Sequence, residues 1–388
     1  MNRQDPHPTL SAAIALQPEL AARAAEMEDV RRLPADLAAK LAEAGLFRMV
    51  TPSEYGGLEC SPIQIVNAVE AVAEANASAG WCVMIGATTA MNAAYMSPEM
   101  AKQVYDDPLT ITGGVFAPMG KAIVDGDDYI VTGRWQWGSG SVNCTWLCGG
   151  AMLFEDGQMK MLPSGRPDAR MMVFPASETE LHDTWHVMGL KGTGSGDISV
   201  EGIRVPKSRS VSLVTDTPHV SGALYKFPAF GLLSLGVAAT ALGNAKGALN
   251  AFIELGSIKK SQGSRKTLGE RGVIQAETAE LMAKFRAARA YLYDEIYQTW
   301  DVAQHSDEIP VERRAALRMA CTHMVRTGAD ICRSLYDMGG GAALFEASDL
   351  QRRFRDAHAM TQHIVTAPAT WELTGRLLFG LETDASMI

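Results

Sequence analysis

Three zones of different residue pattern follow one another along the 388-residue chain, and their order limits the possible folds more than any single motif. Up to about residue 108, Ala-, Leu- and Glu-rich stretches carry apolar residues at the three- and four-residue spacing of amphipathic helices. Short β-branched and aromatic runs between Gly, Pro, Asp and Ser turns follow, and the helical spacing then returns. Because strands and helices do not alternate, a Rossmann fold is excluded. We predict an α+β protein with a helical domain at 1–108, an antiparallel β-domain at 109–213 and a four-helix bundle at 214–388.

The two outer zones predict individual helices. The expected helices lie at about residues 62–76, 79–95, 230–255, 271–304, 310–338 and 348–364. Gly236, Gly243 and Gly247 interrupt the third of these, and because Gly costs a helix roughly 1 kcal/mol relative to Ala, we expect close packing against a neighbouring helix there. In the middle zone, Asp125-Gly126 predicts a tight β-hairpin.

Charge and composition exclude several classes of partner. The chain carries 35 basic and 44 acidic residues, a formal charge of −9, so neither nucleic acid nor an anionic membrane surface is expected as a partner. The longest apolar stretch, Phe230–Gly243, is too short to span a bilayer and predicts a buried helix. The polar first residues lack a secretory h-region, and the six cysteines form no C-x-x-C pair. These features predict a cytoplasmic protein with buried thiols.

No motif for a metal or a nucleotide is recognisable. The sequence contains no G-x-G-x-x-G after a strand, no G-x-x-x-x-G-K-[ST] and no H-E-x-x-H. His358 and His363 are five residues apart, which on one helix separates them by roughly 140°, so they do not form an i, i+4 metal pair. We therefore expect no metal site, and the residues alone favour a structural role for His363.

Three clusters could carry chemistry. The first, GRWQWGSGS, places Trp135 and Trp137 two residues apart, which predicts that they share one face of a strand, and then a turn with Ser139, Gly140 and Ser141. An aromatic wall beside hydroxyls and free backbone N–H groups suits a flat heteroaromatic ring. The alternative is that both tryptophans belong to the sheet core and the turn is an ordinary hairpin.

The other two clusters are glycine-rich. Thr184–Pro206 holds a Gly/Ser/Thr loop before a strand, which could enclose a phosphate or a ring or be only a turn. Gly339, Gly340 and Gly341 follow the predicted helix at 310–338 and permit close approach of the backbone to a ligand.

Together and in this order, these features resemble the acyl-CoA dehydrogenase superfamily over nearly the whole chain. Its flavin-binding strand and turn, with Trp and Ser, are similar to Trp135–Gly140, and the end of its middle domain is similar to Gly189–Pro206. Its bundle has a GG-x-G turn and an R-D-A helix, which Gly339–Gly341 and Arg355–Ala357 resemble.

One departure separates this chain from the dehydrogenases of the superfamily. These have a catalytic Glu shortly after R-D-A, where this chain has Ile364, which cannot abstract a proton. The chain instead resembles the flavin monooxygenase branch in Val115–Ala122, in the W-x-V-x-G-L-K-G-T-G-S stretch that begins at Trp185, and in Trp371–Gly380. We therefore expect no acyl-CoA oxidation, and Glu254 on the bundle helix is the replacement base to consider if it occurs.

The resemblance implies the oxygenase component of a two-component flavin-dependent monooxygenase. A separate reductase would supply reduced FAD, with FMN possible, and O₂ would form a C4a-hydroperoxyflavin that hydroxylates a small aromatic substrate, phenolic or indolic. The apolar segment Gly80–Met96 is the expected pocket lining, in a deep site between β-domain and bundle. A homotetramer is expected. The alternatives are an acyl-CoA dehydrogenase and a flavin N-monooxygenase.

The resemblance also assigns site residues. It places a catalytic histidine at His363 and a serine near flavin N5 at Ser139, with Ser141 the competing choice. The cofactor would contact Trp135, Trp137, Ser139, Gly140, Ser141, Gly339, Gly340 and Gly341.

Overall fold

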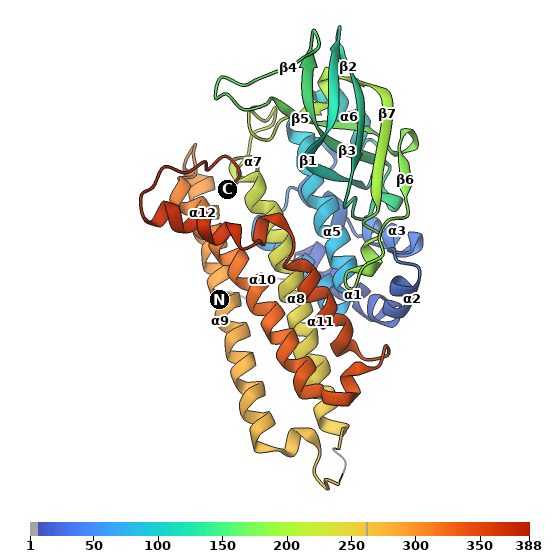
Figure 1. Cartoon of the computed structure of the whole chain (residues 1–388), viewed down its shortest axis with the longest axis vertical. Helices are drawn as coiled ribbons and strands as arrows, with labels where there is room; N and C mark the ends of the chain where they lie inside the picture. The colour runs from blue at the N-terminus through green and yellow to red at the C-terminus, as the bar shows by residue number, and fades with distance from the viewer. Residues whose placement is uncertain (1–6, 261–262) are drawn as a thin grey trace.

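The structure, a computed structural model, describes residues 7–260 and 263–388, in which a helical part, a sheet and a second helical part follow one another (Figure 1). The N-terminal part contains α1 (Pro8–Ala22), α2 (Ala24–Asp29), α3 (Ala35–Glu43), α4 (Pro62–Ala75), α5 (Ala77–Thr89), η3 (Ala90–Ala94) and α6 (Pro98–Tyr105). The helices expected at 62–76 and 79–95 are confirmed as α4 and as α5 with its 3₁₀ extension η3. Both begin at side-chain caps, because Ser61 and Gln64 form a capping box and Asn76 accepts a hydrogen bond from the backbone N–H of Ala79.

The central part is one sheet in the order β6-β7-β2-β1-β3-β5-β8, with β4 paired to β3. Its strands are β1 (Thr112–Asp125), β2 (Asp128–Trp135), β3 (Trp146–Glu155), β4 (Gln158–Met159), β5 (Ala169–Pro175), β6 (Glu180–His182), β7 (Asp197–Pro206) and β8 (Ser210–Val211). The hairpin predicted at Asp125-Gly126 is confirmed, because Asp125 pairs with Asp128 and Gly126 has a φ of 59°.

The prediction of an antiparallel sheet was wrong at one pairing. Strands β1 and β3 are parallel, from the pair Thr112–Trp146 to the pair Ile123–Phe154. The chain returns along one edge of β1 as β2 and then crosses to the other edge of β1 before β3 begins. The sheet is therefore mixed, and the crossing segment after Trp135 is not a simple hairpin loop.

The C-terminal part contains α7 (Ala223–Lys226), α8 (Ala229–Ile258), α9 (Gly272–His305), α10 (Val311–Gly339), α11 (Asp349–Met360) and α12 (Ala369–Leu378). The four predicted bundle helices are confirmed as α8 to α11, and α12 was not predicted. The helix expected to continue to 364 ends instead at Met360, where the hydroxyl of Thr361 donates to the carbonyl oxygen of His358 at 2.7 Å. The short 3₁₀ turn η10 (Ile364–Thr366) follows.

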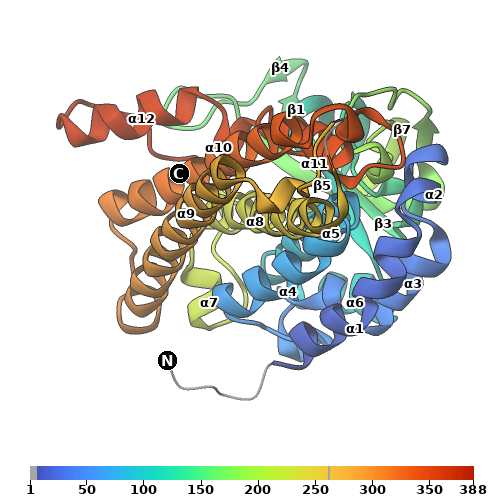
Figure 2. The same ribbon diagram turned by 90° about the horizontal axis from the view of Figure 1, so that it is seen from below.

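Helix α8 is the centre of the molecule. It packs against α4 and α5 on the side of the N-terminal part and against α10 in the bundle (Figure 2). It is long and apolar enough to cross a membrane, but 89% of its most apolar window is buried, as expected for a core helix. A Cβ at Gly243 would lie 2.2 Å from the carbonyl oxygen of Glu70, and one at Gly236 would lie 3.0 Å from Met84. The predicted close packing at these glycines is confirmed.

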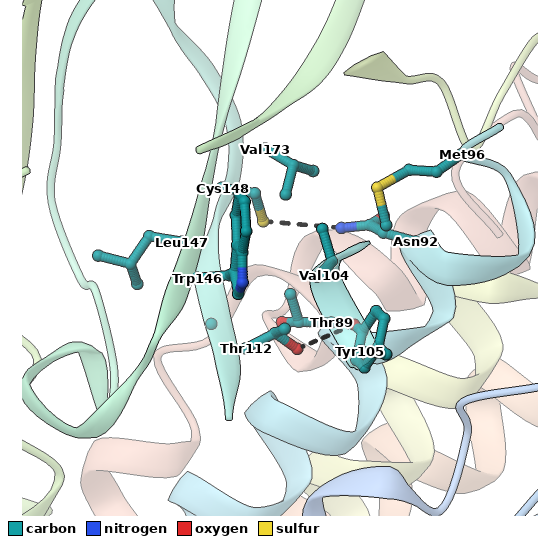
Figure 3. A pocket seen from close by; sticks show the side chains of 11 residues that line it. Thr89, Asn92, Met96, Val104, Tyr105, Thr112, Trp146, Leu147, Cys148 and Val173 are labelled. Atoms are coloured by element: carbon teal, nitrogen blue, oxygen red, sulfur yellow. Dashed lines mark hydrogen bonds between the residues drawn. The ribbon is translucent and has the colours of Figure 1, made fainter. Parts of the chain in front are cut away.

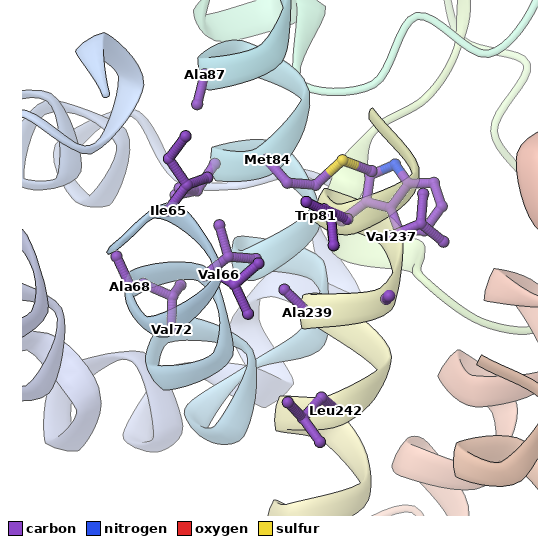
Figure 4. Close-up of a cluster of buried hydrophobic side chains, with 14 of the residues drawn as sticks. Ile65, Val66, Ala68, Val72, Trp81, Met84, Ala87, Val237, Ala239 and Leu242 are labelled. Carbon is purple, nitrogen blue, oxygen red and sulfur yellow. The ribbon is translucent and has the colours of Figure 1, made fainter. Parts of the chain in front are cut away.

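The helical parts share one hydrophobic core, and the sheet has a second core of its own. Figure 4 shows Val66 of α4, Met84 of α5 and Val237 of α8 in the first core. The second core surrounds Trp135 in the sheet. The domain boundaries at 108/109 and 213/214 stay a prediction.

Candidate active site

Two loops of the sheet are joined at the turn Gly138–Ser141, called the Ser139 turn below. The backbone N–H of Gly138 donates to the carbonyl oxygen of Gly196 at 3.0 Å, and that of Gly140 donates to the carbonyl oxygen of Thr193 at 2.8 Å. Gly140 has a φ of 70°, which glycine adopts without strain. The first cluster, Gly133–Ser141, and the second, Thr184–Pro206, therefore form one structure.

A chain of buried hydroxyl groups crosses this junction. The Oγ atoms of Ser139 and Ser195 are 2.7 Å apart, and Ser195 Oγ is 2.6 Å from Thr193 Oγ1. The indole Nε1–H of Trp81, on α5, donates to Ser139 Oγ at 3.1 Å. All four side chains are buried, so they form a polar cluster at the contact between α5 and the sheet.

His363 approaches this cluster from the bundle. Its ring packs edge-on against the indole of Trp81, with centroids 5.5 Å apart and an interplanar angle of 66°. His363 lies three residues after the end of α11 and caps the turn η10, where its Nδ1 accepts from the backbone N–H of Val365 at 3.4 Å. The structure therefore brings His363 and Ser139 to the same indole. The prediction that His363 shares a helix with His358 was wrong, because α11 ends between them.

The electrostatic surroundings keep His363 neutral. Its burial disfavours the charged imidazolium, and the nearby guanidinium of Arg318 adds repulsion, so the pKa of His363 is lowered to about 4. At neutral pH the imidazole is therefore uncharged, and its one unprotonated nitrogen accepts a hydrogen bond.

The loop that carries Ser195 is held by α11. Asp356 accepts a hydrogen bond from the backbone N–H of Leu190 at 2.6 Å, and Leu190 has the left-handed φ of 53°. At the preceding Gly189 there is no room for a side chain, because a Cβ would lie 2.2 Å from the carbonyl oxygen of Arg355. Burial raises the pKa of Asp356 to about 6, against the lowering effect of the Leu190 hydrogen bond. The R-D-A motif thus positions the loop, although its residues lie on another part of the fold.

The two tryptophans of the first cluster have different surroundings. Trp135 is 0% exposed, and its Nε1–H donates to the carbonyl oxygen of Gly150 at 2.7 Å, within the sheet core. Trp137 is 60% exposed and lies beyond the end of β2 with a φ of 69°. The prediction that they share a face was wrong, because the strand ends between them. Trp135 cannot wall a cofactor, since protein atoms cover its ring, whereas the ring of Trp137 is accessible.

The remaining predicted cofactor residues lie at two places. Ser141 is buried in the Ser139 turn, at the start of a 3₁₀ turn. Gly339–Gly341, called the Gly339 turn below, follows α10 at the end of the bundle that is farther from the sheet (Figure 1). It lies near Lys259, at the end of α8. The structure does not bring the Gly339 turn to the Ser139 turn within one chain.

Sequence reasoning missed Trp81, Thr193, Ser195 and Asp356 as members of the site. Trp81 lies in the segment predicted to line a pocket, and Thr193 and Ser195 lie in the cluster Thr184–Pro206. The segments were recognised, but not these residues within them, because the hydrogen-bond partners of a loop hydroxyl are decided only when the chain has folded.

Two small cavities lie between the N-terminal helices and the sheet. Asn92 and Met96 face Cys148 and Val173 across the first (Figure 3). Ser139, Gly140 and Cys82 line part of the second. Each has room only for a molecule of about the size of water, so neither accommodates an aromatic ring. Asn92 and Met96 belong to the segment at 80–96, but the deep substrate pocket expected between the sheet and the bundle stays a prediction.

The residues around the Ser139 turn fit a flavin ring. A flavin has an apolar face and a polar edge. The accessible indole of Trp137 and the buried hydroxyl of Ser139 present both kinds of surface two residues apart. A serine oxygen can make three hydrogen bonds, and Ser139 Oγ makes two within the chain. One position remains for a ligand.

Comparison with known families confirms the resemblance. The family model for the N-terminal domain of acyl-CoA dehydrogenases matches residues 11–107, and that for the C-terminal domain matches residues 235–368. The crystal structure of 3-HSA hydroxylase from Rhodococcus sp. superposes with a TM-score of 0.92 at 28% identity, covering 99% of this chain and 100% of the other.

Curated relatives of similar length are monooxygenases. Indole-3-acetate monooxygenase of Acinetobacter baumannii is 30% identical over 365 residues, 92% of this chain and 90% of the relative. The oxygenase subunit HsaA of a flavin-dependent monooxygenase from Mycobacterium tuberculosis is 30% identical over 400 aligned positions, 100% of this chain and 99% of the relative. The oxygenase component of the FADH(2)-dependent resorcinol hydroxylase of a Rhizobium species is 29% identical, covering 92% of this chain and 91% of the relative. The chain therefore belongs to the flavin-dependent monooxygenases that are built on the acyl-CoA dehydrogenase fold.

Proposed function

We propose that this oxygenase hydroxylates a small aromatic substrate, phenolic or indolic, with reduced flavin from a separate reductase. The observation that carries the proposal is the meeting of a neutral, half-buried imidazole, His363, with the Ser139 turn at the indole of Trp81. The reduced flavin, when bound, activates O₂ and supplies the oxygen atom that is transferred.

In this proposal His363 is the base. Electrophilic hydroxylation requires an electron-rich ring, and a phenol or indole becomes more electron-rich when its O–H or N–H proton is shared with an acceptor. A neutral imidazole nitrogen accepts a hydrogen bond from that O–H or N–H near neutral pH and so shares its proton, whereas a serine hydroxyl is a poor base. His363 therefore shares the substrate proton through Nε2, in the tautomer that gives up the long 3.4 Å contact between the backbone N–H of Val365 and Nδ1.

Ser139 and Trp137 hold the flavin in this proposal, with Ser139 rather than Ser141 at the polar edge. Only Ser139 has a side chain in the buried hydroxyl chain with Trp81 and Ser195. The apolar surroundings of Trp81, with Met84 and Val237 beside it, help to exclude water from the reaction (Figure 4).

The substrate class, the reductase and the cofactor rest on the relatives. Their names give indole-3-acetate and resorcinol as aromatic substrates, an oxygenase subunit or component, and FADH(2). We therefore infer an aromatic substrate, a separate flavin reductase, and FAD rather than FMN. We also infer a cytoplasmic location, since the six cysteines are free thiols, five of them buried, whose pKa values burial raises.

A homotetramer is the proposed assembly. Leu344 and Phe345, beside the Gly339 turn, are 68% and 71% exposed, and such large apolar side chains favour a partner surface. A second copy docked there would also bring the Gly339 turn to the flavin of another subunit, which one chain cannot do.

Acyl-CoA oxidation is disfavoured by geometry. Ile364, at the position of the dehydrogenase Glu, is exposed beside His363. Glu254 is exposed near the end of α8, whereas Val237 of the same helix lies beside Trp81. Seventeen residues of helix separate them, roughly 25 Å at 1.5 Å per residue, so Glu254 cannot serve as the base at this site.

The test is oxygen consumption with product analysis. The protein, enzymatically reduced FAD or FMN, and a panel of phenols and indoles are mixed with O₂, and products are identified by mass. We expect hydroxylated product with FAD. Oxygen uptake that yields only hydrogen peroxide with every aromatic substrate, or bleaching of bound flavin by acyl-CoA thioesters without O₂, would refute the proposal.

A further inference from the structure

The hydrogen bonds of the hydroxyl chain all run in one direction, and this direction can be deduced from the chemistry of its two ends. At one end, Thr193 Oγ1 lies 2.8 Å from the carbonyl oxygen of Leu190. A carbonyl oxygen can only accept, so the hydroxyl proton of Thr193 is used there. At the other end, the indole N–H of Trp81 can only donate, and it donates to Ser139.

The protons between these ends follow. Because the proton of Thr193 points to Leu190, Ser195 must donate its own proton to Thr193 Oγ1, at 2.6 Å. Because the proton of Ser195 is then used, Ser139 must donate to Ser195 Oγ, at 2.7 Å. Ser139 Oγ receives the proton of Trp81 at one lone pair. It keeps one free lone pair and no free proton.

The carbonyl that sets the direction is itself fixed. The Leu190 carbonyl oxygen also accepts from the indole N–H of Trp185 at 3.0 Å, and the backbone N–H of Leu190 is bonded to Asp356 at 2.6 Å. Leu190 therefore cannot turn its carbonyl away to release the proton of Thr193. The buried position of all three hydroxyls keeps solvent from supplying an alternative partner.

We propose that Thr193 and Ser195 are positioning residues that make Ser139 a hydrogen-bond acceptor only, so that the site selects the reduced flavin over the oxidised flavin. This inference rests on the proposed placement of the flavin edge at Ser139. Reduced isoalloxazine carries a hydrogen on N5 and can donate to Ser139, whereas oxidised isoalloxazine has only a lone pair there. Against an acceptor-only serine, the oxidised ring loses a hydrogen bond and leaves two lone pairs facing one another.

Such selection suits an oxygenase that receives its flavin already reduced. The reduced form would bind and remain, and the oxidised form left after turnover would be released for reduction elsewhere. Because the oxidised ring leaves a buried polar group without its partner, the expected preference for the reduced form is about tenfold or more.

The experiment measures dissociation constants of reduced and oxidised FAD for the whole protein, by anaerobic titration followed by absorbance or fluorescence. The wild type should bind the reduced form more tightly. In Ser195→Ala the proton of Ser139 loses its acceptor and becomes free to donate to the oxidised ring. Thr193→Val removes the carbonyl anchor, so the chain can reverse. Both variants should lower the preference for reduced FAD about tenfold, mostly through tighter binding of the oxidised form.

Three further variants separate an effect of hydrogen-bond direction from a general loss of structure at the site. Thr193→Ser keeps the anchoring hydroxyl and should keep the preference. Trp81→Phe removes a donor to Ser139, but Ser139 still donates its own proton to Ser195. The affinity for both forms of FAD should fall, and the preference for reduced FAD should stay. Thr299→Val, at a buried threonine on α9 that donates to the carbonyl oxygen of Glu295, is the control for loss of a buried hydroxyl.

A wild type that binds both forms equally would overturn the inference. So would folded Ser195→Ala and Thr193→Val variants in which the two dissociation constants rise together, because that result indicates structural damage only. If one variant does not fold, the other still decides. The titration needs no aromatic substrate. A loss of the preference for reduced FAD in these variants therefore supports the inference even if no hydroxylated product is found. Failure of the inference and failure of the proposed hydroxylation can thus be distinguished.

Discussion

The Ser139 turn and the Gly339 turn are both rich in glycine, and both resemble cofactor-binding segments of the family. In the Ser139 turn, hydroxyls and backbone groups bond to a second loop and to α5, and a histidine from the bundle reaches the same indole. At the Gly339 turn, Gly340 and Gly341 are exposed, and a Cβ at Gly341 would meet no atom within 4 Å.

The difference teaches that glycine content alone does not identify a site. At the Ser139 turn, glycines allow polar groups of several elements to converge. At the Gly339 turn, Gly340 adopts φ 53° and ψ −148°, a conformation that glycine tolerates, and the turn ends a long helix. The following predictions test this contrast, from the largest expected effect to the smallest.

Removing the imidazole at the Ser139 turn should have the largest effect. In His363→Ala, hydroxylated product should fall by about 10²- to 10⁴-fold, as is typical when a general base is lost, with hydrogen peroxide released instead. Affinity for reduced flavin should change little, because His363 is proposed to act on the substrate. The measurement is product per flavin oxidised.

His358→Ala is the matched control. His358 packs edge-on against Phe354, at 4.6 Å, on α11 rather than against Trp81. It should keep the wild-type ratio of product to peroxide. A wild-type ratio in His363→Ala would mean that the histidine is structural and that the active site lies elsewhere.

Breaking the hydrogen bond that attaches the Ser195 loop to α11 should have the second largest effect. Asp356→Ala leaves the backbone N–H of the buried Leu190 without an acceptor, which should cost about 1–3 kcal/mol of unfolding free energy and weaken binding of reduced flavin. Asp356→Asn keeps an acceptor oxygen and should retain flavin binding. Urea unfolding and flavin titration measure both effects. Equal loss in the two variants would contradict a role for this hydrogen bond.

The Gly339 turn should affect flavin binding only through assembly of the tetramer. Phe345→Asp places a charge on the exposed apolar surface beside it, so light scattering should detect smaller species than a tetramer. If the turn contacts the flavin of another subunit, affinity for reduced flavin should fall about tenfold, or 1.4 kcal/mol. Met161→Asp, at an exposed methionine of the sheet part, should leave both unchanged. A wild-type protein that is monomeric at 41.7 kDa on dilution would remove the basis of this prediction.

The smallest effect should be that of pH on the ratio of hydroxylated product to hydrogen peroxide. Since the pKa of His363 is lowered to about 4, the product-to-peroxide ratio should stay flat from pH 8 to about pH 5.5 and fall only near pH 4. The unfolded chain binds this proton near pH 6.5, so the stability contributed by His363 is present above pH 6.5 and is lost as pH falls toward 4. An acid limb near pH 6.5 would show that the imidazole is solvated in the working enzyme.

The sequence by itself determined the order of helices, sheet and bundle, the bounds of the long helices to within a few residues, and the glycines of α8, because these follow from periodicity, local turn chemistry and backbone space. It also identified Ser139 and the loop within Thr184–Pro206 as candidates from their residue pattern, and His363 through family resemblance. Only the tertiary structure decided that β3 runs parallel to β1, that Trp135 is core while Trp137 is accessible, and that Asp356 holds the loop of Ser195. The physical reason is that hydrogen-bond direction, desolvation of an imidazole and burial of an indole depend on groups distant in the chain, and no local pattern encodes which of them will meet.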